Sequence, residues 1–213
     1  MTNIISNVST NGMLRLKATY QYVFFGVLTA MLGTFMVFPY AAAITGWTFW
    51  GIVILEFVVL FAFMWKKHLV TYLLFTLLTG ITLVPIIAHF VNADMAGVVI
   101  QAFAGTTVIT ALLTFYAATT KKNYLSMGQI LFYILIGVII MMIINIFIGS
   151  SILAFILSIV TTVLFSFFII YDTQQVLHTD IEPLDAAMNL YLDILNLFTS
   201  LLQILGILGG DND

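Results

Sequence analysis

Long runs of apolar residues, separated by short polar segments, dominate the pattern along this chain. Each run has about the 20 residues that an α-helix needs to cross the hydrocarbon core of a bilayer. The runs are much longer than the roughly ten-residue alternating strands of an outer-membrane barrel. Because every backbone N–H and C=O group in hydrocarbon needs an internal partner, the runs predict helices. We predict seven spans, at about residues 19–38, 47–65, 69–88, 95–119, 127–148, 152–178 and 186–208.

The polar segments between these runs are too short to hold a second domain. We therefore expect one seven-helix transmembrane domain over residues 18–208, preceded by a cytoplasmic segment (residues 1–17) and followed by a short acidic tail (residues 209–213). The first apolar run is longer than the roughly 7–15-residue core of a signal peptide, so we expect it to remain as the first span.

Composition agrees with a membrane protein, since 62% of the 213 residues are hydrophobic and 7% are charged. Soluble domains carry about a quarter charged residues, and so few charges cannot cover a surface in water. The fold class is therefore all-α and polytopic. The absence of cysteine excludes disulfides, thiol catalysis and cysteine-ligated metals. A net charge of −3 gives no basic patch for nucleic acid.

The basic residues indicate an orientation for the seven spans. All six fall on one side of the membrane in this arrangement: Arg15, Lys17, Lys66, Lys67, Lys121 and Lys122. Because lysine and arginine accumulate in cytoplasmic loops, we expect the N-terminus inside and the C-terminus outside.

Three acidic residues, Glu56, Asp172 and Asp193, interrupt the apolar runs. A carboxylate at membrane depth costs several kcal/mol and indicates function by default. Asp172 lies six residues before the expected helix end at His178, roughly 9 Å, and Asp193 lies seven residues after Ala186, roughly 10 Å. Since the two spans are antiparallel neighbours, the two carboxyl groups should lie at similar depth, where they could face each other.

Two facing carboxyl groups share a proton, because repulsion and desolvation both favour binding it. Such a pair titrates as one unit and can switch with pH. Asp172 and Asp193 are thus candidates for a pH sensor and gate, and for transient oxygen ligands of Ca²⁺. The alternative is a proton-sharing pair that only fixes the packing of the two helices.

Three further positions are candidates for an ion pathway. Glu56, near the middle of the second span, either lines that pathway or is a protonated group bonded to a nearby threonine or carbonyl. Pro85 frees the carbonyl of Ile81, giving either a hinge with an ion-facing carbonyl or a kink relieved by threonine hydroxyls. The third candidate is His178, which belongs to a cytoplasmic loop with Asp180, Glu182 and Asp185. This loop is either simply solvated or concentrates cations at a pore mouth.

Three segments resemble the Bax inhibitor family, also called the TMBIM family. Residues 187–198 read AMNLYLDILNLF and resemble its C-terminal signature. Residues 165–175, FSFFIIYDTQQ, are similar to its sixth-helix motif, and residues 80–86, GITLVPI, to its third-helix segment. The resemblance covers most of the chain and is strongest to the short bacterial members of the YetJ type.

The resemblance implies two three-helix layers around a central C-terminal helix, and a pH-sensitive calcium leak channel in a bacterial plasma membrane. The aspartate pair of the family falls on Asp172 and Asp193, and its second-helix glutamate on Glu56. Ca²⁺ would be the transported ion and H⁺ the regulator, with a monomeric pore, the lipid bilayer as partner and no cofactor. The tail here is acidic, unlike the basic tail of animal relatives, and the short loop at residues 66–68 argues against a basic gate partner there.

Other functions use the same carboxyl groups. A proton-coupled calcium or cation exchanger would need them too, and a non-transporting regulatory membrane protein is also compatible with the sequence. Intramembrane aspartyl proteases are similar in placing Tyr-Asp on one span and a second aspartate on the next, but their second aspartate follows Gly-x-Gly. Here the bulky Tyr191 and Leu192 precede Asp193, so we expect no enzyme.

Overall fold

The computed structural model describes residues 9–210, which fold into helices without any β-strand in that range. The helices are α1 (Thr10–Val37), the 3₁₀ helix η1 (Phe38–Ala43), α2 (Gly46–Lys66), α3 (Leu69–Thr82), α4 (Val84–Asn92), α5 (Ala96–Thr119), the 3₁₀ helix η2 (Leu125–Met127), α6 (Gly128–Ile148), α7 (Ser151–His178) and α8 (Pro183–Gly210).

Seven helical stretches of the described chain are long and apolar enough to cross a membrane, which confirms the predicted number of spans. The first begins at Thr10, earlier than the predicted position 19. The helix extends beyond the apolar run because the Ser9 side chain accepts a hydrogen bond from the Gly12 amide (3.0 Å) and caps it. Of the predicted terminal segments, residues 1–8 and 211–213 lie outside the described residues, and Gly209 continues α8.

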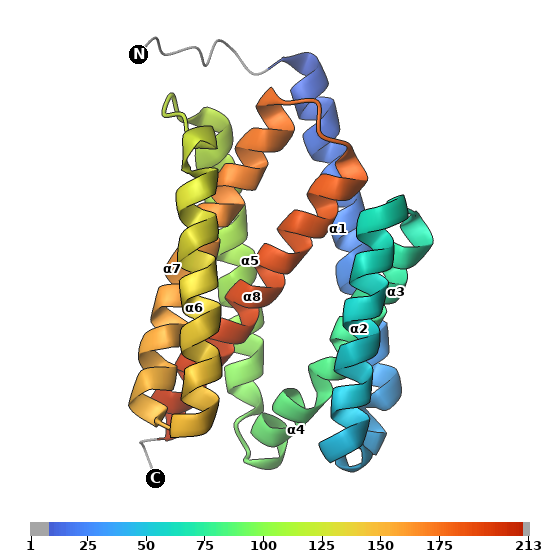
Figure 1. The fold of residues 1–213 in the computed structure, drawn as a ribbon, viewed down its shortest axis with the longest axis vertical. Coiled ribbons are helices and arrows are strands. Elements are labelled where there is room, and N and C mark those ends of the chain that lie inside the picture. The colour runs from blue at the N-terminus through green and yellow to red at the C-terminus, as the bar shows by residue number, and fades with distance from the viewer. Residues whose placement is uncertain (1–8, 211–213) are drawn as a thin grey trace.

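Two groups of three long helices flank the C-terminal helix, as expected. Figure 1 shows α8 running diagonally between α1, α2 and α3 on one side and α5, α6 and α7 on the other. Within the first group α3 packs on both α1 and α2, and within the second α7 packs on both α5 and α6. Helix α8 packs on α7, α5 and α1, so it joins the two groups.

A seam of small residues holds α1 against α3. Gly80 of α3 lies so close to Ala30 of α1 that a Cβ atom at Gly80 would overlap the Ala30 carbonyl oxygen. The Thr34 hydroxyl donates across this seam to the Gly80 carbonyl (2.8 Å). Small residues that bring backbones together in this way are the usual basis of helix association in membranes.

The third span is interrupted where Pro85 predicts a kink. Helix α3 ends at Thr82 and α4 begins at Val84, with Pro85 in its first turn. The Leu83 amide still bonds to the Thr79 carbonyl (3.1 Å). After the break α4 turns toward the end of α8 (Figure 1), where the Phe90 ring packs directly against the backbone at Gly206.

The outer surface is apolar and carries tryptophan at two levels. All three tryptophans of the chain lie on α2, with Trp47 and Trp50 near its start and Trp65 near its end. Trp47 and Trp65 are 92% and 87% exposed and lie roughly 27 Å apart along the helix. That separation is close to the thickness of the hydrocarbon core, about 30 Å, and tryptophan favours its two interfaces.

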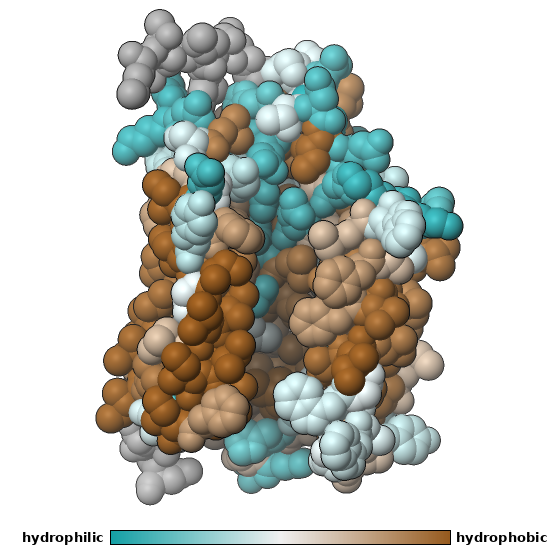
Figure 2. All heavy atoms as spheres, in the orientation of Figure 1, coloured by the Kyte–Doolittle hydropathy of each residue, from teal (hydrophilic) through white to brown (hydrophobic). Residues whose placement is uncertain are grey.

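The basic residues lie at one end of the bundle, which we call the basic end, and two of them form ion pairs there. Arg15 pairs with Asp180 (3.2 Å), and Lys67 pairs with Asp185. The Gln174 amide donates to the Lys122 carbonyl (2.8 Å). Figure 2 shows hydrophilic residues concentrated at this end, and the surface between the two helix groups hollowed, with hydrophilic residues in the half nearest that end.

Candidate functional site

Asp172 of α7 and Asp193 of α8 face each other inside the bundle. Their side chains lie within hydrogen-bonding reach of each other, and the residues are 6% and 4% exposed. Asn189, one turn before Asp193 on α8, also faces Asp172. The structure therefore brings together the two carboxyl groups that the helix lengths predicted to be close.

One oxygen of this pair has no donor. Asp193 Oδ2 is buried without a hydrogen-bond partner in the described part of the chain. Two ionised carboxylates offer only acceptors, and buried polar atoms normally have a partner. A single proton held between the two groups would remove the repulsion between two buried negative charges.

Side chains from α1, α5 and α7 surround the pair. The Tyr20 hydroxyl of α1 bonds to the Thr114 hydroxyl of α5, and Asp193 and Thr173 lie beside it. Thr173 is completely buried. Helices from both groups thus meet at the aspartate pair. A change in the charge of the pair therefore changes the electrostatic potential at side chains of both groups.

The ends of α7 and α8 explain how the pair aligns. Helix α7 ends at His178, as predicted, whereas α8 begins at Pro183, three residues before the predicted Ala186. Proline is favoured in the first helical turn, where its missing N–H is not needed. Asp193 therefore lies deeper along α8 than the prediction gave, ten residues after Pro183. Figure 1 shows that α8 is inclined across the bundle.

Glu56 occupies a separate polar group on the other side of α8. The Thr82 hydroxyl donates to Glu56 Oε2 (2.9 Å) and also lies 2.9 Å from the Thr79 carbonyl. The Thr79 hydroxyl bonds to the Tyr191 hydroxyl of α8. Glu56 is therefore linked to α8 by hydroxyl groups, and in the described residues no hydrogen bond joins it to Asp172 or Asp193.

We predict that Thr82→Val destabilises the protein by about 1–3 kcal/mol, because a partly buried carboxyl group loses its donor. The measurement is thermal unfolding of the purified protein in detergent. Thr107→Val is the matched control, since the exposed Thr107 hydroxyl bonds only within its own helix, to the Phe103 carbonyl (2.9 Å). Equal melting temperatures for the two variants would contradict this account of Glu56.

The other two predicted pathway residues lie apart from the aspartate pair. Pro85 is at the break between α3 and α4, three residues after Thr82, whose hydroxyl donates to Glu56. His178 ends α7, half-buried, at the basic end. The chain therefore has a buried carboxyl pair in the half of the bundle nearest the basic end, a further carboxyl group bonded to Thr82 before the helix break, and an imidazole at the basic end.

The sequence model described as "Inhibitor of apoptosis-promoting Bax1" matches residues 12–210, almost the whole chain. The protein belongs to the Bax inhibitor family. The match includes both aspartates, Glu56 and the broken third span, so the resemblance noted in three segments extends through the complete bundle.

Bacterial members of the Bax inhibitor family align over most of the chain. An uncharacterized protein of Campylobacter jejuni is 40% identical over 200 residues, covering 89% of this chain and 87% of its own length. An uncharacterized protein of Helicobacter pylori is 36% identical and covers 90% of this chain and 85% of itself. An uncharacterized membrane protein of Vibrio cholerae is 37% identical over 149 residues, 69% of this chain and 67% of its own. With the seven apolar helices, these relatives identify an integral membrane protein.

The ion pairs at the basic end of this Bax inhibitor family member were not predicted. Asp185 raises the pKa of Lys67, first by accepting its hydrogen bond and then through its charge. A raised lysine pKa means that the pair is fully formed below the ordinary value of about 10.4 and is lost only at still higher pH. The pair is therefore constant near neutral pH and cannot act as a pH sensor there.

Sequence spacing gives no signal for such contacts, since Lys67 and Asp185 are far apart in the chain.

The described residues contain no group of three or more histidine and acidic side chains that could hold a metal ion. The aspartate pair has two carboxyl groups, with four oxygen atoms in all, fewer than the six to eight oxygens that Ca²⁺ takes in a stable site.

Proposed function

We propose that this protein is a pH-sensitive calcium leak channel, with Asp172 and Asp193 as the pH sensor and gate. The observation that carries the proposal is the contact between two buried carboxyl groups on adjacent antiparallel helices. Membership of the Bax inhibitor family agrees with this function.

The charge of the pair decides what α7 and α8 can do. With one shared proton, the two helices are bridged by a hydrogen bond at a buried site. Without it, two negative charges face each other at low effective dielectric, and they either repel or attract a cation. The protonation state thus sets both the contact between the helices and the attraction for Ca²⁺.

Glu56, Pro85 and His178 mark the proposed ion route through the pore of a single chain. Glu56 offers a second carboxyl group beside the broken span, and His178 lies at the basic end. The hydrophilic surface that continues from this end into the hollow between the helix groups supports access for a hydrated ion (Figure 2).

We also propose that the basic end faces the cytoplasm of a bacterial cell, with the protein in the plasma membrane. The gathering of lysine and arginine at that end supports this orientation. The C-terminus would then lie outside.

The test is calcium flux into liposomes that contain the purified protein and a calcium dye. We expect protein-dependent flux down a calcium gradient, with a rate that changes by up to about tenfold per pH unit between about pH 6 and 8, the limit for one proton. Protein-free liposomes are the control. Absence of protein-dependent flux throughout this range would reject the channel and would favour a non-transporting regulatory protein.

A proton-coupled exchanger is distinguished in the same liposomes. Its carboxyl groups would carry H⁺ one way and Ca²⁺ the other, so an imposed pH gradient would drive calcium uphill. A leak channel moves calcium only down its own gradient.

A further inference from the structure

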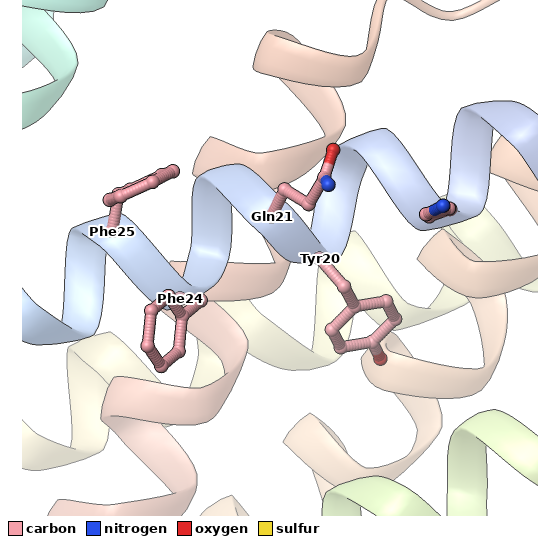
Figure 3. Close-up of a pocket in the computed structure, with 5 residues that line it drawn as sticks. Tyr20, Gln21, Phe24 and Phe25 are labelled. Atoms are coloured by element: carbon pink, nitrogen blue, oxygen red, sulfur yellow. The ribbon is translucent and has the colours of Figure 1, made fainter.

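Five residues of α1 line a shallow surface groove of about 470 Å³: Lys17, Tyr20, Gln21, Phe24 and Phe25. Their spacing is i, i+3, i+4, i+7 and i+8, which places them along one face of the helix. In Figure 3 Tyr20 and Phe24 project to one side of α1 and Gln21 and Phe25 to the other. The groove therefore runs along the helix between two rows of side chains.

The chemistry of the groove changes in one direction. Lys17 is nearest the basic end, Tyr20 and Gln21 follow about one turn further, and Phe24 and Phe25 lie about a turn beyond them. From Lys17 to Phe25 the distance along the helix is roughly 12 Å. A cation, then hydrogen-bonding groups, then apolar rings is the order that matches the phosphate, ester region and acyl chains of a phospholipid.

Lys17 is an exposed cation without an acidic partner in the described part of the chain, where the ion pairs involve Arg15 and Lys67 instead. Phe24 and Phe25 are 60% and 54% exposed within a membrane-spanning helix, so lipid is what they contact. Basic sites at the cytoplasmic side of membrane helices attract anionic headgroups. The unpaired charge of Lys17 is therefore available to an anion at the depth of a headgroup.

We propose that this groove binds one anionic phospholipid, with its phosphate at Lys17 and its acyl chains against Phe24 and Phe25. Tyr20 belongs to both this groove and the interior, since its hydroxyl bonds to Thr114 close to Asp193. The lipid site therefore adjoins the aspartate pair, and experiments on it must leave Tyr20 unchanged.

The proposal is tested by lipid binding to the purified full-length protein in detergent, measured by native mass spectrometry and thermal shift. The probes are phosphatidylglycerol and phosphatidylcholine with identical acyl chains. We expect tighter binding of phosphatidylglycerol to the wild type, and about fivefold weaker binding after Lys17→Gln, the effect of one lysine near a charged surface. Binding of phosphatidylcholine should weaken less after Lys17→Gln, because its choline cation offsets the negative charge of its phosphate.

Lys121→Gln is the matched control, because Lys121 is exposed at the same end but outside the groove. It should bind phosphatidylglycerol like the wild type. Equal affinity of the wild type for the two lipids, or an equal loss in both lysine variants, would overturn the proposal in favour of general attraction to a basic surface. Phe24→Ala/Phe25→Ala should weaken both lipids, and unchanged binding in that variant would remove the acyl-chain contact. None of these results depends on calcium flux.

Discussion

Changing both Asp172 and Asp193 to asparagine should abolish the pH dependence of calcium flux while the bundle remains folded. The change removes the titratable protons but keeps side chains of the same shape, and an asparagine amide donates to the neighbouring carbonyl oxygen as a shared proton would. Flux that varies by up to about tenfold per pH unit in the wild type should vary less than about twofold in the double variant. The measurement is the liposome assay across about pH 6 to 8.

The two single variants separate sensing from packing. Each keeps one carboxyl group without a like-charged neighbour, so we expect a pH profile of flux that differs from that of the wild type. Asp94→Asn serves as the control, because Asp94 is an exposed acidic residue between α4 and α5. An unchanged pH profile in the double variant, together with a shifted melting temperature, would show that the pair only fixes helix packing.

Replacing Gly80 with alanine should have the largest effect on folding. The added Cβ atom would overlap the Ala30 carbonyl oxygen, which is backbone and cannot rotate away. Helices α1 and α3 would have to separate, and the Thr34 bond to the Gly80 carbonyl (2.8 Å) would be lost with the seam. We expect a loss of about 3 kcal/mol or more, as for severe overpacking, measured by melting temperature and by the monodisperse fraction in size-exclusion chromatography.

Gly137→Ala provides the comparison for the α1–α3 seam. Gly137 also lies within a helix, but a Cβ atom there would have no neighbour within 4 Å. Alanine at that position should leave stability unchanged or raise it by about 0.5–1 kcal/mol through its better helix propensity. Similar melting temperatures for the two alanine variants would show that the seam is looser than its geometry indicates.

The overall architecture was predictable because it follows from solvent and length. Apolar runs of bilayer length in a chain with few charges can form only membrane helices, and Pro85 marks its own break. The approach of Asp172 to Asp193 was predictable for the same reason, since the two helices are joined by a short loop. Helix length and direction then place the carboxyl groups near each other.

Contacts between distant segments could not be predicted in this way. The bond between Tyr20 and Thr114 joins two helices, and the pairing of Lys67 with Asp185 joins the α2–α3 loop to α8. The geometry of both contacts depends on how the helices are inclined. The shortness of the loop at residues 66–68 gives no indication that Lys67 pairs with Asp185. The left-handed backbone of Lys67 (φ 49°), which ends α2, has no signal in the sequence.

The confinement of tryptophan to α2 has a practical consequence. Because Trp47, Trp50 and Trp65 are the only tryptophans of the chain, its tryptophan fluorescence arises from one helix, near both ends of that helix. Lipids brominated at different depths would quench the two ends separately. Fluorescence quenching of the unlabelled protein would thus report the depth and tilt in the membrane of α2, the helix that holds Glu56.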